Sequence, residues 1–238
     1  MRFDVLAIGA HPDDADLGVG GLLCKLAKAG KRTAILDLSE GELGSRGTVA
    51  ERREEASAST TILGVTTRFN AQLPDGGITN SMEQRLALVR ILRETRPTIV
   101  LGPMEPDRHP DHEGAHKLVK DACFFSGVHG IDTGQVPHRP TTVYGYYAYQ
   151  EGEKLPSHVV DISTVFERKM DALRSFRSQF YNPDYEGAAT HVASQQFWDS
   201  IETRAAYWGN RIGVRYGEPL YGTLPVAMDL PPELEEQS

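Results

Sequence analysis

Two short polar clusters in the sequence combine side chains that can bind a metal ion with side chains that can move protons. The first is Ala10-His11-Pro12-Asp13-Asp14, and the second is Asp107-Arg108-His109-Pro110-Asp111-His112. Imidazole and carboxylate groups suit a borderline cation such as zinc. His11, Asp14 and His112 can supply two imidazoles and one carboxylate, which would leave an open position for water.

Each cluster alone also has an ordinary structural interpretation. His109 and His112 form an H-x-x-H spacing that is common in proteins and mostly carries no function. Asp13 or Asp14 could cap a helix that follows, since acidic side chains favour that end of a helix. Asp111 could likewise cap a helix, or it could hold a metal-bound imidazole in its working tautomer. Only the convergence of both clusters would favour a metal site over these alternatives.

Hydrophobic periodicity places each cluster directly after a predicted strand. The predicted strands cover residues 3–10, 32–39, 66–73 and 98–102, and the predicted helices cover residues 16–31, 48–64, 80–96 and 112–127. Strands that alternate with helices favour right-handed crossovers and a mostly parallel sheet that is covered on both faces. The predicted fold class is therefore α/β, with a Rossmann-like, doubly wound sheet.

The expected topology brings the two clusters to one crevice. In the common strand order 3-2-1-4-5, strands 1 and 4 are neighbours, and ligands bind beyond their carboxyl ends. A dinucleotide site would need the pattern G-x-G-x-x-G there, but after Gly18 and Gly20 the last position is Leu23. The acidic residues that follow the first strand would also repel a pyrophosphate. The sequence therefore predicts a metal centre and excludes a dinucleotide site.

The regular alternation loosens after about residue 127. Further strands are predicted at 142–150 and 157–163, and further helices at 164–180 and 193–213, before a segment rich in Gly and Pro. The sequence contains no internal repeat and no low-complexity linker. We therefore expect a single domain over residues 1–238, with a core at about 1–127 and a C-terminal elaboration at about 128–238.

Composition excludes several classes of partner. The chain has 238 residues and a net charge of −8, which argues against nucleic acid or an anionic membrane as a partner. Its two cysteines, Cys24 and Cys123, lie in apolar stretches and predict a reducing compartment. No segment approaches the roughly 18 consecutive apolar residues of a membrane span. A soluble, cytoplasmic protein is expected.

The two clusters together resemble the motifs of a known enzyme family. AHPDD after the first strand and DRHPDH after the fourth are similar to the LmbE-like (PIG-L type) N-acetylglucosaminyl deacetylases. These are zinc-dependent amidohydrolases on a Rossmann-like fold. The phrases GELGSRG (41–47) and RREEA (52–56) also match the family. RYGEPLYGTLP (215–225) resembles the branch that deacetylates N-acetylglucosaminyl malate in bacillithiol biosynthesis.

The resemblance implies a role for each site residue. It makes His11, Asp14 and His112 ligands of one Zn²⁺ per chain, with Fe²⁺ as the alternative in the cell. It makes Asp13 the general base and a protonated His109 the group that stabilises the oxyanion.

Two arginines are candidates for substrate binding. The resemblance places Arg52 against the substrate. Without the resemblance, the run of charged residues that begins at Arg52 would be typical of a solvated helix face. Arg108 could meet an anionic substrate or pair with Asp107 or Glu105.

The resemblance also implies an activity and a set of partners. The expected reaction is hydrolysis of the acetamide of an N-acetylglucosaminyl conjugate, most simply N-acetylglucosaminyl malate. The alternatives are a general N-acetylglucosamine or chitooligosaccharide deacetylase and a non-catalytic sugar-binding module. Asp13 disfavours the binding module, because binding alone needs no base. The expected partners are a small amino-sugar substrate and further copies of the chain in a trimer or hexamer.

Overall fold

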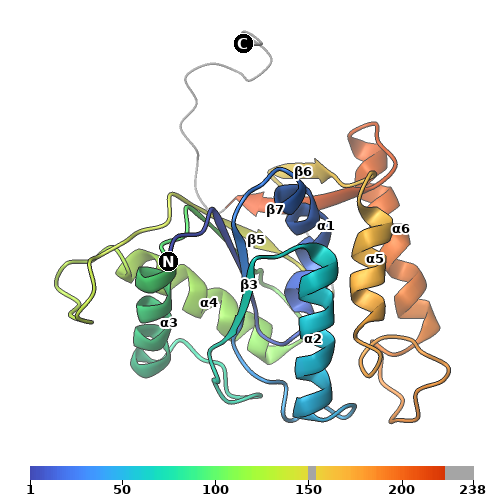
Figure 1. The fold of residues 1–238 in the computed structure, drawn as a ribbon, viewed down its shortest axis with the longest axis horizontal. Coiled ribbons are helices and arrows are strands. Elements are labelled where there is room, and N and C mark those ends of the chain that lie inside the picture. The colour runs from blue at the N-terminus through green and yellow to red at the C-terminus, as the bar shows by residue number, and fades with distance from the viewer. Residues whose placement is uncertain (150–153, 223–238) are drawn as a thin grey trace, which may run out of the picture.

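The computed structural model describes residues 1–149 and 154–222. These residues form a central sheet that is covered by helices on both faces (Figure 1). The strands in these residues are β1 (Val5–Gly9), β2 (Thr33–Asp37), β3 (Thr67–Asn70), β4 (Ile99–Pro103), β5 (Thr142–Tyr146), β6 (His158–Asp161) and β7 (Gly217–Gly222). The helices are α1 (Asp14–Lys28), α2 (Val49–Leu63), α3 (Met82–Thr95), α4 (Pro110–Phe125), α5 (Phe166–Arg174) and α6 (Gln195–Arg211).

The strand order is β3-β2-β1-β4-β5-β7-β6, and the first five strands are parallel. β1 and β4 pair side by side, with Val5 opposite Ile99. The predicted α/β class and the predicted neighbourhood of these two strands are therefore confirmed. Their carboxyl ends form the switch point of the doubly wound sheet.

Alternating side chains of each central strand bury two separate cores. In β1, Val5 and Ala7 pack with α1, α2, α5 and α6, whereas Leu6 and Ile8 pack with α3 and α4. Figure 1 shows these two groups of helices on opposite sides of the sheet. Burial on both faces explains why the strands read as continuous apolar runs. It also holds the ends of β1 and β4 in a rigid frame.

Helix α2 shows how local sequence sets an element's ends. Thr48 accepts a hydrogen bond from the Glu51 backbone N–H, and the Glu51 carboxylate accepts from the Thr48 N–H, which completes a capping box. Gly64 ends the helix at φ 76°, a left-handed conformation that favours glycine. The predicted helix over 48–64 is confirmed.

Gly18 serves packing between α1 and the sheet. A Cβ atom at this position would lie 2.1 Å from the ring of Tyr146 in β5. The Tyr146 hydroxyl also donates to the Ile8 carbonyl of β1 at 2.8 Å. The glycine therefore allows close packing of a helix on a strand, which agrees with the exclusion of a dinucleotide site.

The C-terminal half differs from expectation in two elements. β7 falls in the segment rich in Gly and Pro and was not expected, because proline is rare inside sheets. The register of β7 explains why a proline is tolerated. Pro219 pairs with Val159 of β6 on one side, whereas only Tyr221 and Gly222 of β7 pair with β5 on the other side. Within the described strands, Pro219 therefore has no partner residue in β5 that would need its missing N–H. The helix expected over 164–180 is shorter, since α5 ends at Arg174. Residues 223–238 of the predicted elaboration lie outside the described residues.

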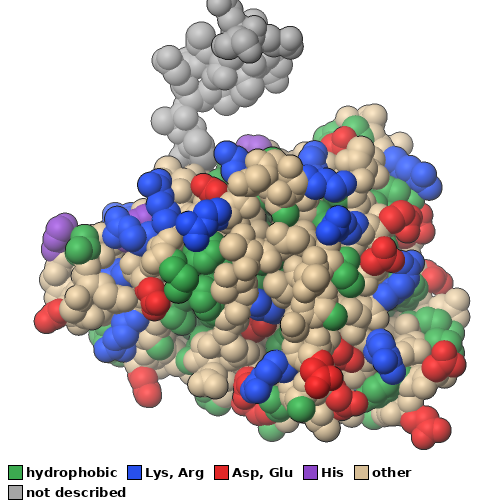
Figure 2. Space-filling model, viewed as in Figure 1, with side chains coloured by type: hydrophobic (Ala, Val, Ile, Leu, Met, Phe, Trp, Pro, Cys, Tyr) green, Lys and Arg blue, Asp and Glu red, His purple; other side chains and the backbone are tan. Residues whose placement is uncertain are grey.

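The strands after residue 127 continue the same sheet, and we propose that the chain forms one domain. Within the described ranges, no helix is both long and apolar enough to cross a membrane. Figure 2 shows acidic and basic side chains interspersed over the face that it presents.

Candidate metal centre and active site

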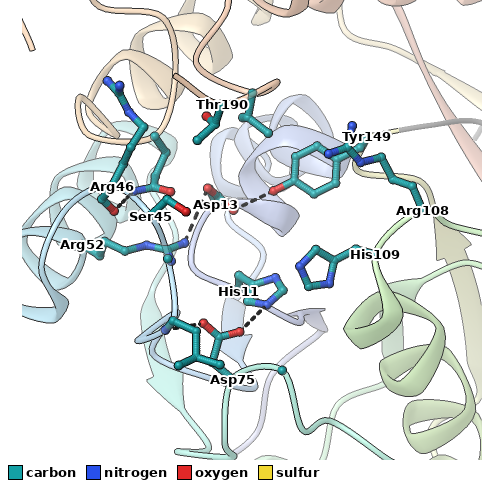
Figure 3. A pocket seen from close by; sticks show the side chains of 15 residues that line it. His11, Asp13, Ser45, Arg46, Arg52, Asp75, Arg108, His109, Tyr149 and Thr190 are labelled. Carbon is teal, nitrogen blue, oxygen red and sulfur yellow. Dashed lines mark hydrogen bonds and ion pairs between the residues drawn. The ribbon is translucent and has the colours of Figure 1, made fainter. Parts of the chain in front are cut away.

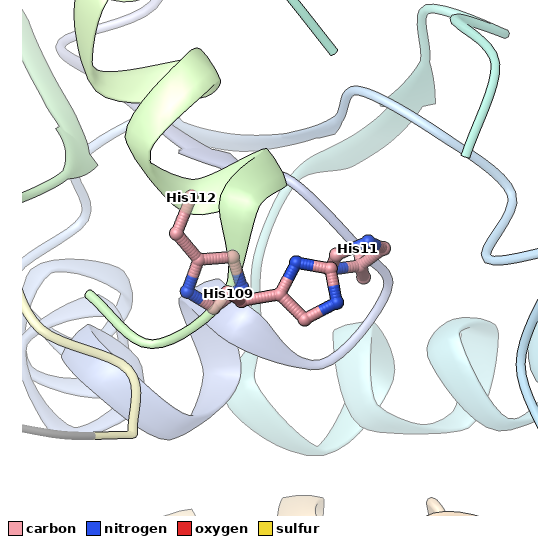
Figure 4. Close-up of side chains that lie close together, drawn as sticks. All are labelled: His11, His109 and His112. Atoms are coloured by element: carbon pink, nitrogen blue, oxygen red, sulfur yellow. The ribbon is translucent and has the colours of Figure 1, made fainter. Parts of the chain in front are cut away.

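The two polar clusters meet at the carboxyl ends of β1 and β4. His11 follows β1, while His109 and His112 lie at the start of α4, just after β4. One nitrogen from each of these three rings lies within 4.8 Å of the other two (Figure 4). The convergence that the topology predicted is therefore present.

Asp14, in the first turn of α1, adds a carboxylate beside two of these rings, His11 and His112. Its Oδ2 lies 3.2 Å from His112 Nε2 and 3.6 Å from His11 Nδ1. Asp14 Oδ1 and His112 Nε2 are buried, and neither has a hydrogen-bond partner among the described residues. Buried polar atoms without a partner are costly. Two imidazoles and a carboxylate with such atoms fit a cation such as zinc.

Carboxylates on the outer side orient both imidazoles. His11 Nε2 lies 3.0 Å from Asp75 and 3.3 Å from Asp111, and His112 Nδ1 lies 3.1 Å from Asp107. The other nitrogen of each ring therefore faces Asp14. A carboxylate behind each histidine is the usual arrangement of metal ligands, because it fixes the tautomer and raises the basicity of the ring.

Asp111 therefore lies against a histidine, and its role as helix cap is not observed. The N-cap of α4 is His109, whose Nδ1 accepts the Asp111 N–H at 3.2 Å. The Asp111 carboxylate accepts from the backbone N–H groups of Gly76 and Ile78, at 2.7 and 3.1 Å. It thus ties the loop after β3 to the metal centre.

Sequence reasoning missed Asp75 and Asp107 as partners of the histidines. Asp107 stands inside the second cluster and was considered only as a partner of Arg108. Asp75 follows β3, a third parallel strand whose carboxyl end reaches the same edge of the sheet. That topological position was the available signal for Asp75.

The charges of the proposed ligands support one another. Burial by itself would raise the pKa of Asp14, but the charge of His112 and hydrogen bonding to His11 lower that pKa well below its usual range. Burial by itself would lower the pKa of His112, but Asp14 and Asp107 raise that pKa to about 9. The Asp14 carboxylate is therefore ionised.

Asp13 presents its carboxylate to the cavity. It occupies the N-cap position of α1 at φ 139°, yet its side chain makes no capping hydrogen bond within the described chain. Oδ2 lies 3.7 Å from Arg52 Nη2, and Oδ1 lies 3.5 Å from the Tyr149 hydroxyl. Burial raises the pKa of Asp13 to about 7, although the charge of Arg52 opposes this. A carboxyl group with such a pKa is suited to general base catalysis near neutral pH.

The surroundings of His109 influence the charge of its ring. Burial lowers its pKa below the usual value, and the charges of His11 and His112 lower it further. Because Nδ1 accepts a backbone N–H, the neutral ring carries its proton on Nε2. These surroundings favour a neutral ring that donates from Nε2, and the protonated His109 that would stabilise the oxyanion stays a prediction.

Arg52 is buried rather than solvated. Its guanidinium donates to the carbonyls of Gly41 and Pro12, at 2.9 and 3.2 Å, and lies beside Asp13. A Cβ atom on Gly41, which has φ 69°, would lie 1.8 Å from Arg52 Nη1, so the loop needs glycine there. Arg52 therefore braces two loops of the site, and its contact with substrate stays a prediction.

Arg108 is exposed and lines the cavity with Tyr149 (Figure 3). Within residues 1–149 and 154–222, Arg108 forms no hydrogen bond or ion pair. The alternative pairing with Asp107 or Glu105 is therefore not observed.

The cavity has a volume of about 440 Å³. Its lining includes His11, Asp13, Leu43, Arg46, Arg52, Asp75, Arg108, His109, Tyr149, Gln179 and Thr190. This volume lies within the range of about 300–1,000 Å³ that is usual for sites of small molecules. Residues from both halves of the chain therefore line one cavity of a size suited to a small molecule.

A buried charge network joins α1, β2 and β3 and gives a stability prediction. Arg68 of β3 donates to Asp16 at 3.0 Å and to Asp37 at 2.7 Å, and Ser59 also donates to Asp16. Arg68→Met should lower the free energy of unfolding by about 3–5 kcal/mol, because two buried carboxylates would lose their cation. Urea denaturation would measure the change.

Arg53→Met provides a matched control for this prediction. The Arg53 side chain is 72% exposed and pairs with Glu40 at the surface. Its loss should cost less than about 1 kcal/mol. Equal effects of the two substitutions would contradict the importance of the buried network.

Fold and site together define a class of protein, a doubly wound α/β protein with a candidate metal centre at the switch point of its sheet. The family model for GlcNAc-PI de-N-acetylase (PIG-L) matches residues 6–123. Diacetylchitobiose deacetylase of Thermococcus kodakarensis is 33% identical over 230 residues, which covers 90% of this chain and 80% of the relative. The chain belongs to the PIG-L family and is an enzyme of the N-deacetylase class.

Two further proteins are similar to this chain. The conserved protein TT1542 of Thermus thermophilus superposes with a TM-score of 0.86 and 36% identity, covering 95% of this chain and 97% of that protein. The 4-oxalmesaconate hydratase of Pseudomonas putida is 27% identical, covering 80% of this chain and 78% of the relative. The predicted family is confirmed, whereas nothing in these likenesses points to the bacillithiol branch.

Proposed function

We propose that the protein hydrolyses the acetamide of an N-acetylglucosaminyl disaccharide or conjugate. The observation that carries this proposal is a pair of buried atoms, Asp14 Oδ1 and His112 Nε2, that lack a hydrogen-bond partner within residues 1–149 and 154–222. They lie near the carboxylate of Asp13, which lines the cavity. A set of donors next to a free base is what metal-assisted hydrolysis needs. The similarity to a diacetylchitobiose deacetylase over most of the chain supports an amino-sugar substrate.

The residues of the chain divide the reaction between them. His11, Asp14 and His112 would hold the metal, and bound zinc would lower the pKa of water toward about 7 and polarise the acetamide carbonyl. Asp13 accepts a proton from the attacking water and returns it to the leaving nitrogen. His109 donates from Nε2 to the carbonyl oxygen as negative charge develops there. A bond forms between the water oxygen and the carbonyl carbon, the C–N bond then breaks, and acetate and a free amine leave.

Acetate release from a panel of N-acetylglucosaminides, with and without a chelator, tests the proposed function. We expect release from at least one disaccharide or conjugate and its loss with the chelator. If the protein bound metal but released acetate from none of them, a sugar-binding module or a different reaction would be favoured. Hydration of 4-oxalmesaconate should therefore be assayed in parallel, because one relative is a 4-oxalmesaconate hydratase.

N-acetylglucosaminyl malate is the second candidate substrate, and Arg108 is the observation that favours it. An exposed guanidinium at the cavity without a partner among the described residues can grip a carboxylate through two parallel hydrogen bonds. Arg108→Ala should lower kcat/KM for the malate conjugate roughly 10- to 150-fold. It should spare an uncharged chitobiose derivative. The measurement is kcat/KM for both substrates.

Arg52→Ala gives the contrast for this prediction. The Arg52 guanidinium donates to two backbone carbonyls and lies beside the Asp13 carboxylate. Its loss should therefore lower kcat/KM equally for both substrates. Equal losses on both substrates in Arg108→Ala would reject selective recognition of the malyl group. A wild type that prefers the uncharged sugar would favour the chitooligosaccharide substrate.

The finer expectations of the sequence remain part of this proposal. Zinc is the proposed metal, with iron as the alternative. A cytoplasmic location and a trimer or hexamer stay predictions.

A further inference from the structure

Tyr149 lies between the proposed base, Asp13, and one of the proposed metal ligands, His112. The proposed reaction assigns no role to this tyrosine. It follows β5 and lines the cavity, half-buried, where Figure 3 shows its hydroxyl pointing toward Asp13. The aromatic segment at 144–149 reads as core in the sequence. Only the fold reveals which of its rings reaches the site.

The ring of Tyr149 packs flat on His112. The two ring centroids are 5.1 Å apart, and the planes are inclined by only 15°. His112 also stacks with His109 at 5.1 Å. Because Asp107 already holds Nδ1 of His112, stacked neighbours restrict the remaining tilt of the ring and hence the direction of Nε2.

The hydroxyl of Tyr149 faces the base. Its oxygen lies 3.5 Å from Asp13 Oδ1, while Arg52 lies 3.7 Å from the other carboxylate oxygen. A phenol carries its proton at neutral pH and can donate it. Hydrogen bonds of an active site are often long without substrate and shorten in the reacting complex.

The main chain at Tyr149 is itself held in place. Arg204 of α6 donates to the carbonyls of Ala148 and Tyr149, at 2.9 and 3.4 Å. The Tyr149 ring also contacts Phe197 of α6, with centroids 5.9 Å apart. A helix of the C-terminal half thus supports a ring in the metal centre.

We propose that Tyr149 is a positioning residue, whose ring orients His112 for the metal and whose hydroxyl orients the Asp13 carboxylate for proton transfer. The proposal rests on the proposed function for the role of the hydroxyl, but the role of the ring concerns metal binding alone. Two substitutions separate these roles. Tyr149→Phe removes the hydroxyl and keeps the ring, and Tyr149→Leu removes both.

The first measurement is zinc affinity by titration of the metal-free protein. Tyr149→Leu should weaken zinc binding about 10- to 100-fold, which is the usual cost of removing a residue that contacts and orients a metal ligand. Tyr149→Phe should bind zinc like the wild type. If Tyr149→Leu unfolds at the assay temperature, Tyr149→Met fills the space without a ring and replaces it. Unchanged zinc affinity in the Leu or Met variant would overturn the role of the ring.

The second measurement is kcat and KM for the acetylated substrate in zinc-loaded protein. Tyr149→Phe should lower kcat about tenfold and leave KM and zinc content unchanged. Tyr216→Phe is the matched control. Tyr216 is buried directly before β7, and its hydroxyl donates to Glu202 of α6. It does not line the cavity. Full kcat in Tyr149→Phe would overturn the role of the hydroxyl. A wild type without acetate release would reject the proposed function, while the zinc affinities would still decide the role of the ring.

Discussion

Asp13→Asn should leave the metal bound and lower kcat by roughly 10²–10⁴, the usual contribution of a general base. The amide keeps the shape of the carboxylate but cannot take a proton from water at neutral pH. The structure leaves Asp13 free for this role, because its carboxylate caps no helix in the described chain and burial raises its pKa to about 7. Acetate-release kinetics together with elemental analysis of bound metal would measure both effects.

Two results would contradict this assignment in different ways. Near-normal turnover in Asp13→Asn would show that another group accepts the proton. Loss of the metal from the variant would show that Asp13 is itself a ligand. The distinction matters because Asp13 and Asp14 are adjacent, and only their different directions at the start of α1 separate base from ligand.

The framework of the site was predictable because it depends on local patterns and on topology. Continuous apolar runs mark strands that are buried on both faces, and Thr48 and Gly64 mark the ends of α2 by their own chemistry. Parallel strands with helical crossovers then bring the ends of β1 and β4 together. The convergence of His11 with His112 follows from these rules.

The support of the site was less predictable, because it depends on contacts between distant segments. Asp75 meets His11 only because the loop after β3 folds back over the ends of the strands. Arg52 reads as a solvated helix residue until the loop around Gly41 encloses its guanidinium. Tyr149 is one of several tyrosines in its segment, and contacts with His112 and with α6, both distant in the sequence, hold it at the site. None of these contacts can be predicted from the spacing of residues along the chain.

Among substitutions of the proposed ligands, His112→Ala should have the largest effect on metal binding. Removal of one of three ligands leaves Asp14 and His11 with an incomplete site. His112 is also the ligand that connects the carboxylates of Asp107 and Asp14, so its loss disrupts both contacts. We expect purified His112→Ala to lack the metal that the wild type holds at about one ion per chain, and to release no measurable acetate. Elemental analysis and zinc titration would measure the loss.

A graded series on the same helix makes this prediction specific. Asp107→Asn replaces the carboxylate oxygen that faces His112 Nδ1, while the remaining amide oxygen can still accept the His109 N–H. The substitution should weaken zinc binding about 10- to 100-fold without abolishing it. His116→Ala removes a histidine one turn further along α4 whose Nδ1 lies 3.0 Å from the Pro103 carbonyl, and it should leave zinc affinity unchanged. The expected order of loss is therefore His112→Ala, then Asp107→Asn, then His116→Ala. Full metal content in His112→Ala would show that His109 or Asp75 completes the centre instead, because both contribute to clusters of donors around His11.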